Sequence, residues 1–222
     1  MDKRTEILSV ITTQSLMPLY FAADETVSVD VLKALYSAGC RVIEYTNRGK
    51  EALLNFKKLR SVCDNEMKDM LLGAGTIKDA NAAEKFVDAG ADFLISPGLA
   101  EDVFDIAYSN KILWVPGCMT ATEIIKAEKF GIQLIKLFPG NILGPSYVSA
   151  IKDIFPDLLF MPTGGVEVEK ENLQNWFSAG VCAVGMGSKL ITKQILENKE
   201  YAKITSLAKE ALMIIKDVKS KK

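Results

Sequence analysis

A lysine in a strongly apolar segment is the residue with the clearest capacity for chemistry. Lys136 lies between Ile135 and Leu137, in a run that we expect to form a β-strand. Because side chains alternate between the two faces of a strand, Lys136 shares a face with Leu134 and Phe138 and can point into the protein interior. Burial favours the neutral amine, which can attack a ketone to form a Schiff base. A lysine that reaches solvent at the strand end, or one in a structural ion pair, would give the same pattern, so these interpretations stay open.

A second charged residue, Glu44, lies inside another predicted strand, at residues 41–46. The same face of that strand carries Val42, Thr46 and, if the strand continues, Arg48. A carboxylate in the interior is unfavourable unless it is paired, so Glu44 is expected to be part of an ion pair or a general acid/base. If Glu44 faces Lys136, it can be both. A purely structural Glu–Lys or Glu–Arg pair is the alternative interpretation.

The absence of histidine narrows the possible chemistry. Among its 222 residues the chain has 28 Asp and Glu, 27 Lys and Arg, and no His. Ser-His-Asp and Cys-His pairs and His-ligated metal sites are therefore excluded, which leaves carboxylate, lysine, hydroxyl and thiol groups. There is also no DxDxDG loop and no cluster of carboxylates at the predicted strand ends. We expect no metal and no other cofactor.

Glycine-rich segments end the last two predicted strands, at Thr163–Gly165 and Gly185–Ser188. Backbone N–H groups in such loops, together with a helix N-terminus, attract an anion, and they indicate a phosphate site. Glycine that only solves a backbone problem is the alternative interpretation. Gly73–Thr76 and Ser96–Gly98 add small residues at other strand ends, where we expect the backbone to approach a small ligand closely.

The elements that must position these residues alternate along the chain. Short apolar runs are separated by segments with helical spacing, several of which end in Ala-Gly before the next strand. This pattern predicts an α/β fold: a (β/α)8 TIM barrel with an extra N-terminal helix, built as one domain over residues 1–222. An open doubly wound sheet is the alternative, although no GxGxxG follows the first strand. The predicted strands are residues 17–22, 41–46, 70–76, 93–98, 112–117, 134–140, 158–165 and 183–188.

Composition limits the partners and the location of the protein. The chain is 49% hydrophobic and 25% charged with a formal net charge of −1, so we expect neither a nucleic-acid nor a membrane partner. No segment approaches the roughly 20 apolar residues of a membrane span, and residues 1–6 lack the features of a signal peptide. The four cysteines form no CxxC pair, which is typical of reduced thiols. A cytoplasmic protein is the expectation.

These motifs together resemble the 2-keto-3-deoxy-6-phosphogluconate (KDPG) / 4-hydroxy-2-oxoglutarate (KHG) aldolase family, the Entner–Doudoroff class I aldolases. The resemblance extends over about residues 17–190 and depends on the order and spacing of short motifs. It implies a (β/α)8 barrel, usually a homotrimer, that acts without a cofactor as a carbon–carbon lyase on 2-keto-4-hydroxy acids and releases pyruvate. The motifs are Glu44–Arg48, Gly73–Thr76, Ser96–Gly98, Pro116-Gly117 with Thr120, Lys136–Pro139, Pro162–Gly165 and Gly187-Ser188.

The resemblance also implies a role for each matching residue. Lys136 matches the lysine that forms the Schiff base, and Glu44 matches the catalytic acid/base. Further residues match groups that hold the keto acid or its phosphate. The substrate-binding residues are Arg48, Thr76, Pro97, Phe138 and Thr163, and the phosphate-binding residues are Gly164, Gly165, Gly187 and Ser188.

Two segments differ from the pattern common in the family. Residues 19–23 contain no basic residue, and Gly140-Asn141 stands where many members have Ala-Glu. The leading hypothesis is cleavage of KDPG to pyruvate and glyceraldehyde 3-phosphate, of KHG to pyruvate and glyoxylate, or of both. Phe21 and Asn141 motivate an alternative, the same lyase chemistry on another 2-keto-3-deoxy acid, such as the galactonate epimer or an unphosphorylated compound. A non-catalytic barrel that binds sugar phosphates is the third hypothesis.

Overall fold

The computed structural model describes residues 2–220 and contains each of the eight predicted strands. The fifth predicted strand is divided at Pro116, where the run changes from one neighbour to another: β5 pairs with β4, and β6 pairs with β7. Proline has no N–H group to donate to a sheet, which suits it to this position. The strands are β1 Leu16–Tyr20, β2 Val42–Thr46, β3 Leu71–Gly75, β4 Phe93–Ile95, β5 Leu113–Val115, β6 Gly117–Cys118, β7 Leu134–Leu137, β8 Leu159–Pro162 and β9 Val184–Met186.

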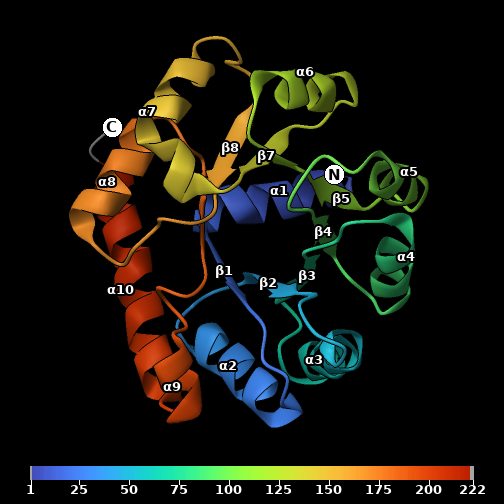
Figure 1. Cartoon of the computed structure of the whole chain (residues 1–222). Helices are drawn as coiled ribbons and strands as arrows, with labels where there is room; N and C mark the ends of the chain where they lie inside the picture. Colours follow the sequence, from blue (N-terminus) through green and yellow to red (C-terminus); the bar gives the residue numbers. More distant parts are fainter. Residues whose placement is uncertain (1, 221–222) are drawn as a thin grey trace.

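The helices form a ring around the strands, and one helix, α1, lies across one end of them (Figure 1). Gly39, Gly90 and Gly180 each follow a helix with φ between 86° and 102°, a conformation that glycine adopts without strain. This confirms the role predicted for the Ala-Gly pairs. The helices are α1 Lys3–Gln14, α2 Glu25–Ser37, α3 Ala52–Glu66, α4 Ala80–Asp88, α5 Glu101–Ser109, α6 Ala121–Lys129, α7 Gly140–Lys152, α8 Lys170–Ser178, α9 Lys193–Glu197 and α10 Tyr201–Lys219.

All strand pairs are parallel, and neighbours in the sheet are neighbours in the chain, except that the last strand, β9, pairs with the first, β1. One sheet has the order β5-β4-β3-β2-β1-β9 and the other has the order β6-β7-β8. A single parallel bridge between Thr163 and Gly185 links the end of β8 to β9. A doubly wound sheet reverses its strand order at a switch point, and this order contains no such reversal. The fold is therefore α/β with a curled parallel sheet surrounded by helices.

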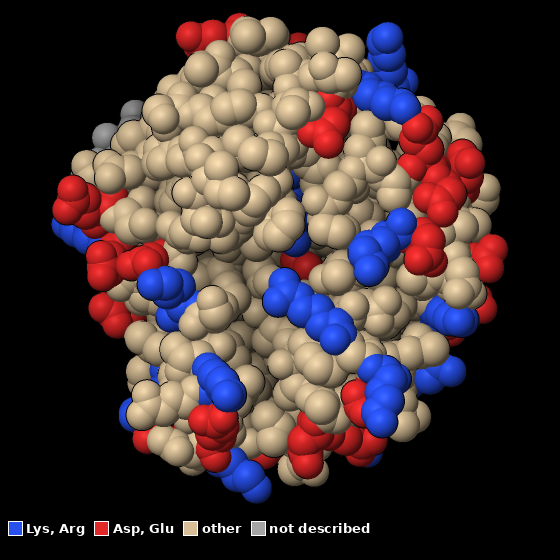
Figure 2. All heavy atoms as spheres, in the orientation of Figure 1, with Lys and Arg blue, Asp and Glu red and all other residues tan. Residues whose placement is uncertain are grey.

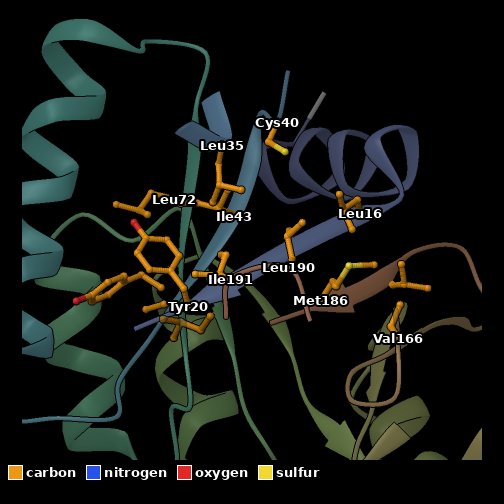
Figure 3. Close-up of a cluster of buried hydrophobic side chains, with 14 of the residues drawn as sticks. Leu16, Tyr20, Leu35, Cys40, Ile43, Leu72, Val166, Met186, Leu190 and Ile191 are labelled. Carbon is orange, nitrogen blue, oxygen red and sulfur yellow. The ribbon is translucent and has the colours of Figure 1, made fainter. Parts of the chain in front are cut away.

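Alternation along the strands divides the apolar core into two layers. Ile43 and Ile135 belong to the outer layer between the strands and the helices, whereas Val42 and Leu134 belong to the inner layer. This is the alternation that the sequence predicts for both strands. Figure 3 shows part of the outer layer, with Leu16, Tyr20, Leu35, Ile43 and Leu72 close together.

The N-terminal helix α1 covers one end of the inner layer. Its buried Ile7 and Ile11 pack with Met17, Phe93 and Met161. The end of the strands where the chain enters them is thus filled by apolar side chains, which leaves the opposite end for polar groups. Within residues 2–220, no helix combines the length and the apolar composition that a membrane span requires.

The four cysteines are free thiols, three of them buried and Cys182 half-buried. Burial raises the pKa of Cys40, Cys118 and Cys182 to about 12 and that of Cys63 to about 11. Since the thiolate is the reactive form, we expect the native protein to react with a disulfide reagent at about pH 8 roughly 10²-fold more slowly than free cysteine. Titration in guanidinium chloride, where all four thiols should react at once, is the control. A rapidly reacting thiol in the native protein would contradict this prediction.

Candidate active site

The two charged residues singled out by the sequence are in contact in the interior. Lys136 Nζ, from β7, donates to Glu44 Oε1, from β2, across 3.5 Å. The two side chains are 5% and 1% exposed, so the interpretation of Lys136 as a lysine that reaches solvent is wrong. Both an ion pair and an amine–carboxylate couple that moves protons fit this geometry.

Two buried polar atoms of predicted site residues, one of them in this pair, lack a hydrogen-bond partner within residues 2–220. They are Glu44 Oε2 and Thr163 Oγ1. An unsatisfied buried polar group costs about 1–3 kcal/mol, and native proteins rarely keep one without a reason. Glu44 is paired with Lys136 and Thr163 lines the cavity described below, so a ligand or water in this region is suited to supply the missing hydrogen bonds.

Glycines in the neighbouring strands make room for these side chains. A Cβ atom on Gly75 would lie 1.8 Å from Glu44 Oε1, and one on Gly185 would lie 2.2 Å from Thr163 Oγ1. Gly73 faces the ring of Phe93 in the same way, at 2.1 Å. Protein side chains therefore occupy the space beside Gly73 and Gly75, and the close approach of a ligand to this strand end stays a prediction. A glycine inside a strand indicates that another group packs closely against the backbone, but the sequence alone does not show whether that group is a ligand or a protein side chain.

A cavity of about 320 Å³ opens at the carboxyl ends of the strands. Figure 2 shows a hollow at the centre of this face, with basic and acidic atoms visible in its depth. Phe138 connects the cavity to the buried pair, because its ring centre lies 5.6 Å from Lys136 Nζ. Arg48 is the one charged side chain among the described residues that line the cavity. The lining residues are Leu19, Tyr20, Phe21, Thr46, Arg48, Phe138, Thr163, Gly164, Gly187, Ser188, Ile191 and Leu196.

Besides Lys136 and Glu44, three of the predicted site residues do not line this cavity. Pro97 lines a separate space of about 180 Å³ beside α5. Gly165 lines another, of about 250 Å³, where its carbonyl accepts hydrogen bonds from Asn172 and Trp176. Thr76 is half-buried directly after β3, with φ of 59°. β2 ends at Thr46, so Arg48 reaches the cavity from the loop and not from a continued strand.

Phe21 forms a wall of the cavity, and a buried network fixes the loop that carries it. The carbonyl of Ala22 accepts hydrogen bonds from Tyr45 Oη at 2.8 Å, Ser28 Oγ at 2.9 Å and Asn55 Nδ2 at 3.0 Å. Burial raises the pKa of Tyr45, so its phenol stays protonated and can donate. The sequence pointed to Phe21 only as a departure from a pattern. It gave no sign that three elements converge on the neighbouring carbonyl.

We expect the substitution Gly75→Ala to destabilise the protein, because the added methyl group displaces the Glu44 carboxylate from Lys136. Breaking a buried ion pair and overfilling a packed interior should together lower the free energy of unfolding by about 2–5 kcal/mol. Gly98→Ala is the matched control, since a Cβ atom on Gly98 meets nothing within 4 Å. Urea denaturation of both variants measures the difference, and equal stabilities would contradict the close contact.

Comparison with known proteins shows the family of the chain. Residues 7–207 match the model of a family described as KDPG and KHG aldolase. The chain is 34% identical to the 2-dehydro-3-deoxy-phosphogluconate aldolase of Pseudoalteromonas atlantica, over 91% of this chain and 92% of that protein.

Solved structures of similar proteins have the same fold. The KDPG aldolase of Legionella pneumophila, solved with pyruvate captured as a covalent carbinolamine intermediate, superposes with a TM-score of 0.84 at 26% identity, over 91% of this chain and 96% of that one. The Zymomonas mobilis enzyme, solved with 3-phosphoglycerate, gives 0.81 at 29% identity, over 94% and 95%. With a family match that spans nearly all of the chain, this protein belongs to the KDPG and KHG aldolase family.

Proposed function

We propose that this chain is a class I aldolase that cleaves KDPG to pyruvate and glyceraldehyde 3-phosphate, KHG to pyruvate and glyoxylate, or both. The observation that carries the proposal is the contact between Lys136 and Glu44 beneath the cavity. A buried amine paired with one carboxylate meets the needs of Schiff-base chemistry without imidazole. The covalent pyruvate carbinolamine of the Legionella relative supports the same chemistry.

In the proposed reaction, Lys136 gives a proton to Glu44 and attacks the ketone carbon of the substrate. Glu44 returns this proton to the hydroxyl group of the carbinolamine, which leaves as water and gives an iminium ion, an electron sink. Glu44 then accepts the proton of the C4 hydroxyl as the C3–C4 bond breaks, and the bonding electrons form an enamine on the pyruvyl fragment. After the aldehyde leaves, C3 is protonated and water hydrolyses the iminium, which frees pyruvate and Lys136.

The remaining predicted residues position the substrate in this proposal. The guanidinium of Arg48 is suited to hold the keto-acid carboxylate with two hydrogen bonds. Phe138 and Thr163 share the cavity with Arg48, and Gly164, Gly187 and Ser188 complete its phosphate end. The roles of Thr76, Pro97 and Gly165 stay predictions, since none of these three residues lines the cavity.

The proposal also includes a closed (β/α)8 barrel with α1 as an extra helix. The bridge between Thr163 and Gly185 supports closure on one side, and the continuity of β5 and β6 through Pro116 supports it on the other. One domain over residues 1–222, a homotrimer and a cytoplasmic location stay predictions. The trimer follows from the family resemblance, and light scattering of the purified protein measures it.

Reduction with borohydride in the presence of pyruvate should attach one pyruvyl group to Lys136, because hydride traps the iminium ion as a stable amine. Peptide mass spectrometry locates the adduct. Lys136→Arg is the matched control, since it keeps a cation opposite Glu44 but forms no imine. An unmodified Lys136, or an equal adduct on the Lys136→Arg variant, would overturn the proposed mechanism.

Activity should be unchanged by EDTA, because the iminium ion replaces a metal as the electron sink. The measurement is the rate of pyruvate release from KHG before and after prolonged dialysis against the chelator. Loss of activity that a divalent metal restores would exclude the class I assignment.

A phosphorylated substrate should react with a higher kcat/KM than its unphosphorylated counterpart, by about tenfold or more, which corresponds to about 1.4 kcal/mol. The two compounds to compare are KDPG and 2-keto-3-deoxygluconate. Ser188→Ala should reduce the advantage of KDPG and leave the second rate nearly unchanged. If phosphate brings no advantage, the glycine-rich loops do not bind it, and the unphosphorylated alternative is favoured. A higher rate with the galactonate epimer would favour the other alternative.

A further inference from the structure

A second cavity lies at the opposite end of β2 from the candidate active site. Its volume is about 720 Å³, more than twice the 320 Å³ of the catalytic cavity and within the range of small-molecule sites. Arg41, just before β2, lines this cavity, whereas Thr46, at the end of β2, lines the catalytic one. The walls come from α1, α10 and the segments that precede β2 and β3. The lining residues are Ser9, Val10, Thr13, Gln14, Gly39, Arg41, Asp69, Leu212, Ile215, Lys216 and Lys219.

The lining combines an apolar surface with an excess of positive charge. Leu212 and Ile215 of α10 and Val10 of α1 supply the apolar part of the lining. Three cations, Arg41, Lys216 and Lys219, and one acid, Asp69, complete the lining, which gives a net charge of +2 (three minus one). An apolar body with an anionic group at one end matches both properties.

The hydrogen bonds of the lining show which cations remain available. Arg41 Nε donates to Asp69 Oδ2 at 2.6 Å, so these two opposite charges compensate each other. Lys219 Nζ donates to the neutral oxygens of Ser15 and Thr12, which leave its charge uncompensated. Lys216 has no ion pair within residues 2–220. Two uncompensated ammonium groups therefore lie one helical turn apart on α10.

The wall of the cavity is held in place before any ligand arrives. Gln14, the last residue of α1, donates to the carbonyls of Leu16 at 2.6 Å and Val42 at 2.9 Å. Its side-chain oxygen accepts from the backbone N–H groups of Arg41 and Val42. These bonds hold α1 against the starts of β1 and β2. Because the walls of the cavity are already ordered, binding of a ligand does not include the entropy cost of ordering them.

We propose that this cavity is a second binding site, specific for a free amphipathic anion. The apolar body of the ligand lies against Leu212 and Ile215, and its carboxylate, sulfonate or phosphate group lies between Lys216 and Lys219. The proposal is independent of the aldolase reaction, since the catalytic cavity shares none of these residues.

The probe for the test is 8-anilinonaphthalene-1-sulfonate, an amphipathic anion whose fluorescence rises on binding in an apolar site. We expect one equivalent to bind to the native protein and decanoate to displace it, whereas decanol should displace it poorly. Lys216→Glu should weaken binding by about tenfold or more, because it turns attraction of the sulfonate into repulsion. Lys209→Glu is the matched control, because Lys209 is an exposed lysine of the same helix that does not line the cavity.

Several results would overturn the proposal. These are equal binding by the two charge-reversed variants, equal displacement by decanol, or binding of the protein to anionic vesicles without binding of the free probe. Absence of probe binding, as would follow if a second copy of the chain covered the cavity, would overturn it as well. Pyruvate trapping in probe-saturated protein separates the two sites: an undiminished adduct supports a separate site, and a lost adduct places the probe in the catalytic cavity.

Discussion

The contact between Lys136 and Glu44 is the constraint around which the interior is arranged. Two opposite charges with 5% and 1% exposure have lost most of their hydration, and their attraction must offset that loss. Removal of either side chain would leave the other as an unpaired buried charge, which is strongly destabilising. The apolar layer sealed by Ile7 and Ile11 restricts polar groups to one end of the strands, so the pair, the cavity and Arg48 all belong to the same end.

Two glycines make room for the polar groups of the site. Gly75 and Gly185 lie against Glu44 and Thr163, and the carboxylate and the hydroxyl occupy the volume that a side chain at either glycine would need. Among residues 2–220, Glu44 Oε2 and Thr163 Oγ1 have no hydrogen-bond partner. Both oxygens are therefore free to bond to a keto acid at the proposed site of reaction. Packing and reactivity are set here by the same residues.

Much of the fold and part of the site could be predicted from the sequence. Period-two alternation placed Lys136 and Glu44 on inner faces correctly, because each strand is short and apolar on its other face. The residues that line the cavity were harder to predict. Pro97 and Gly165 lie at the ends of strands, as expected, but the conformation of each loop places them in other cavities. The network on the Ala22 carbonyl joins α2, β2 and α3, and no local pattern encodes such a convergence.

That same carbonyl has a consequence for laboratory evolution of the enzyme. Three donors from separate elements hold the Phe21 loop, so changes at Phe21 alter the wall of the cavity while its backbone stays in place. Changes at Ser28 or Asn55, which do not line the cavity, would instead release the loop. A mutant library aimed at new aldehydes should therefore vary position 21 with residues 28, 45 and 55 held constant, and a second library at those three positions would sample altered loop shapes.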